Sequence, residues 1–171
     1  MTEQFAADGN AMPKLESARD PFTLEVIKNA LAAAADEMAA TVQRTARSFV
    51  VKEALDYSTA LFGANSEFIA QGTCLPLHLG SMPSALNAVL KQFGDDIAPG
   101  DIFALNDPYD GGTHLPDIIA VLPVFVDGAL VGYSACIAHQ IDMGGRVPGS
   151  MACDSTELYQ EGLRLPPLRL Y

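Results

Sequence analysis

Residues 118–139 read IIAVLPVFV-DG-ALVGYSACIAH and carry the strongest structural signal in the chain. Two apolar runs, 118–126 and 129–139, flank the dipeptide Asp127-Gly128. Apolar runs rich in β-branched residues favour strands, and Asp-Gly is a frequent two-residue hairpin turn because it tolerates positive φ. The sequence therefore predicts a long antiparallel hairpin over this stretch.

The sequence before this hairpin alternates between helical and extended patterns. Apolar residues at three- and four-residue steps predict helices over 20–48 and 81–93, with Asp20 or Thr23 capping the first and Ser81 the second. Short apolar runs at 58–62 and 68–71 predict a second hairpin, and 101–105 predicts a further strand. This order indicates an α+β (mixed α/β) fold with two main helices and a largely antiparallel sheet.

The composition describes one folded domain with an acidic surface. The chain has 171 residues, 49% of them hydrophobic, and its formal net charge is −11. That content supports a core and excludes wholesale disorder. The acidic balance argues against a nucleic-acid partner, which requires a basic face. We expect residues 1–19 to form a flexible tail and residues 20–171 to form the domain.

The cysteines and the apolar stretches indicate the cellular compartment of the protein. The three cysteines are an odd number without CxxC spacing, so a disulfide framework is not expected and the cytoplasm is the predicted compartment. No apolar stretch approaches the ~20 residues that span a bilayer, so no membrane partner is predicted. The run 163–171 is apolar up to the last residue, and we expect it to be buried against another chain or against a continuation of this one.

Acidic residues dominate the middle of the sequence. Between Lys91 and Arg146 there are eight aspartates and no lysine or arginine. Such a set is tolerated when the acids are exposed, protonated or close to a cation. Turn positions explain some of them, but the loop NDPYDGGTHLPD, residues 106–117, combines turn formers with metal-ligand types between two predicted strands.

Strand pairing predicts that three of these side chains converge. His114 and Asp117 are three residues apart, and the 118–139 hairpin returns the chain so that His139 reaches the same end of the sheet. Two imidazoles and a carboxylate suit zinc, manganese or iron. The competing interpretation is that histidines in glycine-rich loops only form turn hydrogen bonds.

Judged by spacing alone, other motifs are weaker evidence for a functional site. His78 lies between leucines, which is typical of a buried histidine with satisfied hydrogen bonds, and Glu53 and Asp56 are typical of a solvated turn. The sequence has neither a GxxxxGK[ST] phosphate loop nor a GxSxG nucleophile motif.

Six segments together resemble the N-terminal part of the hydantoinase B/oxoprolinase family. In chain order they are DPFTLEVIKNAL (20–31), KEALDYS (52–58), PLHLGSMP (76–83), NDPYDGGTHLPD (106–117), AHQIDMGG (138–145) and ELYQEGLR (157–164). The family includes N-methylhydantoinase B subunits, the B-like half of 5-oxoprolinase, and alpha-type subunits of acetone and acetophenone carboxylases. The resemblance covers residues 20–171.

The resemblance implies a divalent metal, with zinc or manganese preferred and iron as an alternative. Its ligands would be His114, Asp117 and His139, with a fourth carboxylate from Asp56 or Glu53. Asp142 or His78 would serve as acid or base at the edge of the site.

Two departures from the family pattern are visible. Many relatives have a second histidine where this chain has Gln140, so a role of that imidazole is lost or is taken over by the amide. Family B subunits are also several times longer, so the chain would be a fragment, part of a split subunit or a degraded gene product.

The resemblance further implies a division of labour between subunits. A hydantoinase A-type partner would bind ATP and phosphorylate the substrate oxygen, and the B-type chain, completed by the remaining B-type polypeptide or a second B-type subunit, would process the activated species. We expect ring opening of a small cyclic amide. The alternatives are carboxylation of a ketone substrate, as in acetone carboxylases, or a non-catalytic binding module.

Overall fold

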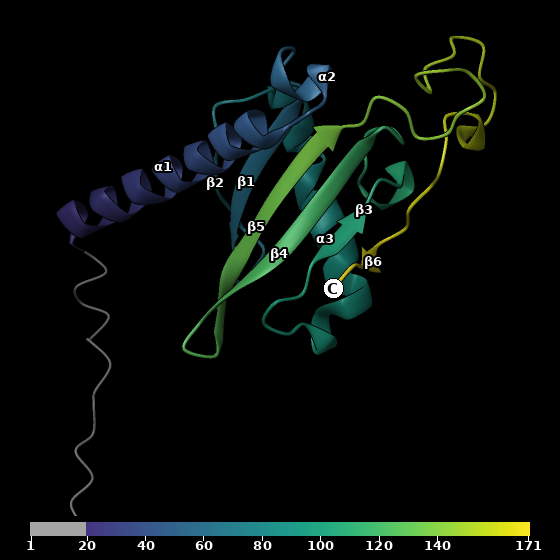
Figure 1. Ribbon diagram of the computed structural model, residues 1–171. Coiled ribbons are helices and arrows are strands. Elements are labelled where there is room, and N and C mark those ends of the chain that lie inside the picture. The colour runs from purple at the N-terminus through teal and green to yellow at the C-terminus, as the bar shows by residue number, and fades with distance from the viewer. Residues whose placement is uncertain (1–19) are drawn as a thin grey trace, which may run out of the picture.

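The computed structural model describes residues 20–171 (Figure 1), so the predicted tail lies outside the described residues. Its helices are α1 (Pro21–Thr45), α2 (Phe49–Lys52) and α3 (Met82–Phe93), and its strands are β1 (Tyr57–Gly63), β2 (Phe68–Gln71), β3 (Phe103–Leu105), β4 (Asp117–Val126), β5 (Ala129–His139) and β6 (Leu168–Arg169). Short 3₁₀ helices lie at Pro76–Gly80, Gly94–Asp96, Pro108–Asp110 and Leu158–Gln160. The fold is therefore α+β, as predicted.

A single six-stranded sheet, in the order β2-β1-β5-β4-β3-β6, forms the centre of the molecule, and every pairing within it is antiparallel. The long hairpin β4–β5 lies in the middle, with Asp127 and Gly128 at its turn, both at positive φ. The predicted hairpin is confirmed within a residue at each end. β6 was not predicted, and it adds to the edge of β3.

One face of the sheet packs against α3. Ala85, Leu86 and Val89 recur at the helical three- and four-residue spacing and are buried against Ile119 and Ile137 of the central strands. Burying a leucine or valine side chain stabilises the fold by about 1.5–3 kcal/mol. Ser81 is the N-cap residue of α3, as predicted, but its hydroxyl donates to the carbonyl of His78 and accepts no hydrogen bond from a helix amide.

α1 lies on the opposite face, over β1 and β2 (Figure 1). Ala35 and Ala39 allow close approach, and the Thr59 hydroxyl donates to the Ala35 carbonyl across 3.0 Å. The Asp20 carboxylate accepts from the Thr23 amide, which confirms that cap. The helix ends at Thr45, before the predicted Ser48, and α2 begins separately.

Only the C-terminal half of α1 is packed on the sheet. The side chains of Leu24 and Ile27, which belong to the predicted apolar stripe, are 51% and 47% exposed. The helix therefore projects beyond the sheet, as Figure 1 shows. None of the described helices is both long enough and apolar enough to cross a bilayer.

The C-terminal segment returns along the sheet edge. Leu168 pairs with Ala104 of β3, whereas Leu163, Leu170 and Tyr171 are exposed. Part of this run thus docks on the chain's own sheet, and burial of the remainder by another polypeptide stays a prediction.

Candidate metal centre

The strand register places two predicted ligands directly opposite each other. Asp117 begins β4 and pairs with His139, the last residue of β5. On the other side of β5, Tyr57 at the start of β1 pairs with Ala138, and the His139 amide donates to the Asp56 carbonyl at 3.1 Å. The ends of three neighbouring strands thus bring Asp56, Asp117 and His139 to one edge of the sheet.

The loop before β4 delivers His114 to the same edge. The Asp117 amide donates to the His114 carbonyl at 3.0 Å, which closes a turn. The buried Asn106 side chain fixes the base of this loop by donating to the Leu115 carbonyl at 2.7 Å. Leu115 is itself fully buried, which anchors the turn between His114 and Asp117.

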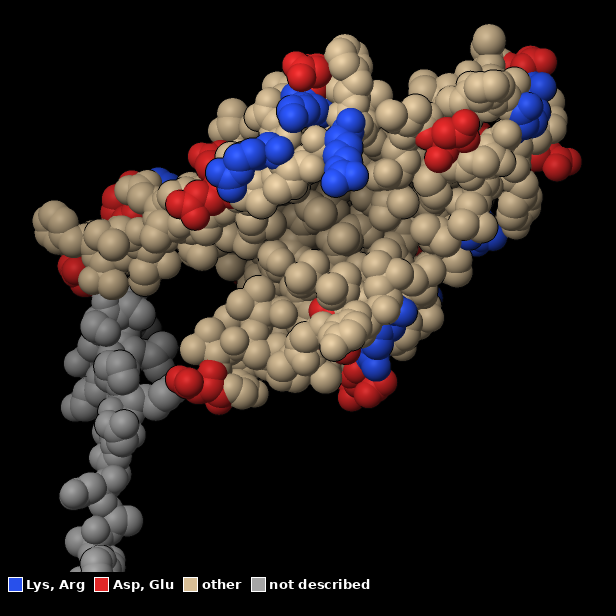
Figure 2. Space-filling view, in the orientation of Figure 1, with Lys and Arg blue, Asp and Glu red and all other residues tan. Residues whose placement is uncertain are grey.

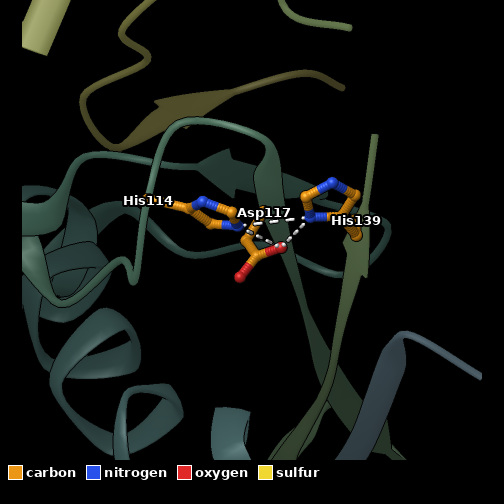
Figure 3. A group of neighbouring side chains, drawn as sticks. All are labelled: His114, Asp117 and His139. Carbon is orange, nitrogen blue, oxygen red and sulfur yellow. Dashed lines mark hydrogen bonds and ion pairs between the residues drawn. The ribbon is translucent and has the colours of Figure 1, made fainter. Parts of the chain in front are cut away.

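Three side-chain atoms meet at this edge (Figure 3). Asp117 Oδ1 lies 3.1 Å from His114 Nε2 and 3.0 Å from His139 Nδ1, and the two nitrogens are 3.2 Å apart. Atoms that bind one ion at about 2.0–2.2 Å are separated by roughly 3–3.5 Å. The side chains predicted to converge therefore do so, and their spacing fits a shared cation.

The protonation of Asp117 suits this role. Burial by itself raises the pKa of Asp117, but hydrogen bonds from His114, His78 and Thr113 outweigh it and hold the pKa well below the usual range. The hydrogen bond with Asp117 raises the pKa of His114, against the opposing effect of burial. In the metal-free chain Asp117 therefore favours proton binding to His114, on the same atoms that would hold a cation.

Asp56 and His78 complete the surroundings of Asp117. His78 Nε2 lies 3.4 Å from Asp117 Oδ2 and 3.4 Å from Asp56 Oδ1, while Asp56 Oδ2 is 3.8 Å from His139 Nδ1. Glu53 is exposed in the turn that follows α2 and belongs to neither group of potential ligands among residues 20–171. The structure therefore favours Asp56 over Glu53, the alternative that the sequence left open.

Asp142 is not brought to this centre. Its exposed carboxylate accepts hydrogen bonds from the Gly144 and Gly149 amides and from the Ser150 hydroxyl. These bonds, that of Gly149 foremost, lower the pKa of Asp142. The contacts indicate a structural role in closing loop 142–150, and the acid–base role expected from its motif stays a prediction.

Gln140 also points elsewhere. Its amide donates to the Ala138 carbonyl at 3.1 Å, and its backbone amide donates to the Pro116 carbonyl at 2.7 Å. The residue thus ties β5 to the loop that carries His114. We find no contact of its side chain with His114, Asp117 or His139 among the described hydrogen bonds.

A pocket of about 310 Å³ opens beside His114 and is lined in part by Glu161, a residue that the motif spacing does not mark as functional. Its walls are formed by His114, Ser150, Met151, Ala152, Cys153 and Glu161. Oε2 of Glu161 is buried and has no hydrogen-bond partner within residues 20–171. The only sequence signal for Glu161 was its place in the segment ELYQEGLR, and its proximity to His114 depends on tertiary structure.

Comparisons with known proteins agree with this architecture. The family model described as hydantoinase B/oxoprolinase matches residues 20–171. The chain is 45% identical over 152 residues to caprolactamase subunit beta from Pseudomonas jessenii, covering 89% of this chain and 26% of that protein. It is 40% identical over 144 residues to 5-oxoprolinase from Saccharomyces cerevisiae, covering 84% of this chain and 11% of that protein.

Solved structures show the same fold. The crystal structure of ATP-dependent caprolactamase from Pseudomonas jessenii matches with a TM-score of 0.82 at 45% identity, over 89% of this chain and 26% of that chain. A nucleotide-free structure of acetone carboxylase matches with a TM-score of 0.83 at 25% identity, over 90% and 21% of the two chains. The chain thus spans about a quarter or less of these relatives.

Proposed function

Since the chain belongs to the hydantoinase B/oxoprolinase family, we propose that it forms the metal-binding part of a B-type subunit that opens a cyclic amide. Activation of the amide would come from an ATP-binding A-type partner. The observation that carries this proposal is the convergence of His114, Asp117 and His139 on one point beside a pocket. Two imidazole nitrogens and one carboxylate, with Asp56 nearby, are a donor set for zinc, manganese or iron.

A cation bound there would supply Lewis acidity toward the substrate carbonyl and would lower the pKa of a water molecule. The residues of the chain have separate tasks. Asp117, held ionised, orients His114 and His139 through contacts of 3.0–3.1 Å. Glu161, whose Oε2 has no partner within the described residues, is available to accept a proton from water in the pocket.

The division between subunits follows from the chemistry. Transfer of the γ-phosphoryl group to the lactam oxygen turns that oxygen into a leaving group. Addition of one water molecule then breaks the ring C–N bond and leaves an acyl phosphate, which a second water molecule hydrolyses, so that lactam, ATP and two water molecules give an amino acid, ADP and phosphate. This sequence contains no GxxxxGK[ST] loop, in keeping with ATP binding by another polypeptide.

The comparisons favour a lactam over a ketone as substrate. Identity to the beta subunit of a caprolactamase is 45%, whereas identity to acetone carboxylase is 25% over a similar length of this chain. Ring opening is therefore preferred to carboxylation. The pocket volume of about 310 Å³ lies at the lower end of the range for small-molecule sites.

A reconstitution assay tests the proposal. The full chain is combined with an A-type subunit and the remaining B-type polypeptide of the same organism, and ADP and ring-opened product are measured with caprolactam and with 5-oxoproline. We expect product only when ATP and all components are present. Glu161→Gln should lower kcat roughly 100-fold or more, the usual contribution of a general base, while Asp127→Asn at the distant hairpin turn should not.

Two results would contradict the proposal. Robust lactam cleavage by the chain alone would show that no partner is needed. Turnover of acetone with bicarbonate, in the absence of any lactam cleavage, would identify the carboxylase alternative instead.

A further inference from the structure

We propose that the pocket between α1, α2 and the end of β5 binds the phosphate group of a small ligand. The pocket has a volume of about 400 Å³, and its wall includes the polar residues Arg47, Ser48 and Gln140. Side chains alternate along a strand, so Ala138 and Gln140 line this pocket while His139 points to the metal centre on the other face of β5. The inference therefore goes beyond the proposed function and does not depend on a bound metal.

The hydroxyl of Ser48 is a buried donor in the wall of this pocket. Its Oγ atom is buried and forms no hydrogen bond within residues 20–171. Ser48 is the N-cap residue of α2, but its side chain does not cap that helix. Leaving a buried polar group without a partner is unfavourable, so a ligand that accepts this proton would be stabilised in the pocket.

Further donors surround the same pocket. The backbone amides of Arg47 and Ser48, in the connection between α1 and α2, donate to no protein group in the part of the chain that the structure describes. The Gln140 side-chain amide donates one proton to the Ala138 carbonyl at 3.1 Å, and its second proton is available. Serine hydroxyls and backbone amides are common partners of phosphate oxygens, which accept hydrogen bonds.

The charge at this corner of the molecule favours an anion. Arg44, Arg47 and Lys52 lie close together in the sequence, and no Asp or Glu occurs between Met38 and Lys52. Across residues 20–171, none of these three cations forms an ion pair. Figure 2 shows Lys and Arg side chains near the junction of α1 and α2. The chain as a whole has a net charge of −11, so an anion is attracted to this corner more than to the acidic surface elsewhere.

A small apolar core holds the pocket in shape. Val51 of α2 packs with Ala39 of α1 and Tyr57 of β1. The Gln43 side-chain amide also donates to the Lys52 carbonyl at 3.2 Å, which joins α1 to α2. The donors of the pocket are thus carried by two helices that are fixed to each other and to the sheet.

The rest of the pocket wall is apolar and limits the ligand class. It includes Val42, Ala46, Val51 and Ala138. A volume of about 400 Å³ is in the range of small-molecule sites and exceeds what a phosphate ion fills. The ligand class is therefore a phosphate group, either as the free ion or as a monoester with a small apolar body.

These features favour a phosphate group over an acidic segment of a partner protein. Surface cations alone would suffice to attract an acidic segment. A buried hydroxyl beside an arginine requires a compact anion that enters the pocket. The planar guanidinium of Arg47 can bind two phosphate oxygens at once, which leaves a third for the Ser48 hydroxyl.

Calorimetric titration of the full chain with inorganic phosphate and with butyl phosphate tests the inference. Divalent metal is first removed with a chelator and desalting, and sodium chloride keeps the ionic strength constant. We expect saturable binding of one phosphate group per chain, and tighter binding of butyl phosphate because its chain contacts the apolar wall. Binding of inorganic phosphate alone would identify the free ion as the ligand.

The variants Arg47→Gln and Ser48→Ala should each weaken binding about tenfold or more, because each removes a hydrogen bond to a charged group. The matched control is Arg146→Gln, which removes the same charge from a pair with Asp154 outside the pocket. We expect this control to change the affinity by less than about twofold. Circular dichroism checks that the variants fold, and the wild-type titration does not depend on them.

Several results would overturn the site. Absence of saturable binding to the wild type would exclude it. Equal weakening by Arg47→Gln and Arg146→Gln would show a general effect of charge, and unchanged affinity in Ser48→Ala would exclude the hydroxyl as a donor. Competition by hexaglutamate at concentrations as low as those of phosphate would identify a surface for an acidic peptide instead. Since the titration is done without metal, failure of the proposed metal centre would leave its outcome unchanged.

Discussion

Both carboxylate oxygens of Asp117 have close polar neighbours. Oδ1 lies within 3.1 Å of nitrogens of His114 and His139, and Oδ2 accepts a hydrogen bond from the Thr113 hydroxyl. A buried carboxylate with so many partners stays ionised. The single residue therefore links the loop, both long strands and His78.

Replacing His114 by alanine removes one of the three converging atoms. Because it supplies a nitrogen 3.1 Å from Asp117 Oδ1, we expect the affinity for zinc or manganese to fall more than tenfold, at least the loss seen for residues that only support a ligand. Competition with a chromogenic chelator measures the affinity. Asp127→Asn removes an acid at the hairpin turn and should leave the affinity unchanged; equal affinities of both variants would refute the assignment of His114.

Metal affinity should fall with decreasing pH. A protonated imidazole cannot bind a cation, and the hydrogen bond with Asp117 raises the pKa of His114 above its ordinary value of about 6.5. Protons should therefore begin to compete above that value. Calorimetric titrations with zinc at pH 8, 7 and 6 should show progressively weaker binding. Constant affinity over this range would contradict metal binding by His114.

In the metal-free chain, a decrease in pH should increase folding stability, whereas it decreases the metal affinity. A raised pKa of His114 in the folded state contributes stability that is fully present below the unfolded pKa of about 6.5 and is lost as pH rises through the folded value. Lowering the pH from 8 to 6 should thus increase the free energy of unfolding of the metal-free chain. In the loaded chain the same change should release metal.

At the scale of elements, the loop that carries His114 depends on Asn106. Its amide donates to the carbonyls of Leu115 and Leu163 at 2.7 and 2.9 Å, and its oxygen accepts from the Leu165 amide at 2.6 Å. This buried side chain joins the end of β3, the loop before β4 and the C-terminal segment. The site is therefore supported by residues that are distant from it in the sequence.

Asn106→Ala should destabilise the fold by about 2–4 kcal/mol, because three hydrogen bonds are lost and buried partners are left unsatisfied. Urea unfolding followed by circular dichroism measures the change. The matched control is Asn65→Ala in the exposed β1–β2 turn, where the side chain accepts one long bond from Glu67 and the expected cost is below about 1 kcal/mol. Equal costs at the two sites would contradict the supporting role of Asn106.

The elements differ in how far the sequence predicts them. The β4–β5 hairpin follows from local patterns, and its pairing is enough to bring Asp117 opposite His139. β6 is only two residues long and follows Pro166-Pro167, so its pairing with β3 is set by tertiary contacts. The choice between Asp56 and Glu53 also depends on where the chain enters β1, because only the last residue before the strand reaches the site.

At the scale of the whole molecule, much apolar surface is exposed. Leu122, Val124 and Val126 alternate along β4 on the face opposite α3, and Val131 of β5 is exposed as well. Figure 2, which views this face, shows a hollow between α1 and the strands with an uncharged floor and with Lys or Arg side chains on its α1 side. A groove of about 430 Å³ there is lined by residues such as Met38, Val42 and Cys136.

The exposed apolar face predicts self-association of the isolated chain, since large contiguous apolar patches are uncommon on monomers. Light scattering at increasing concentration should show oligomers or aggregates. Val124→Lys combined with Val131→Lys, on the exposed face, should reduce the association. A clean monomer at all concentrations, with residues 163–171 sensitive to protease, would count against this expectation.

Anomalous diffraction at the zinc edge, from crystals of the full chain grown with zinc, tests the metal centre most directly. We expect a strong peak enclosed by His114 Nε2, Asp117 Oδ1 and His139 Nδ1, the three atoms that lie 3.0–3.2 Å apart in the metal-free arrangement. Peaks found only at other acidic residues, with these three side chains bonded to one another as they are here, would contradict it.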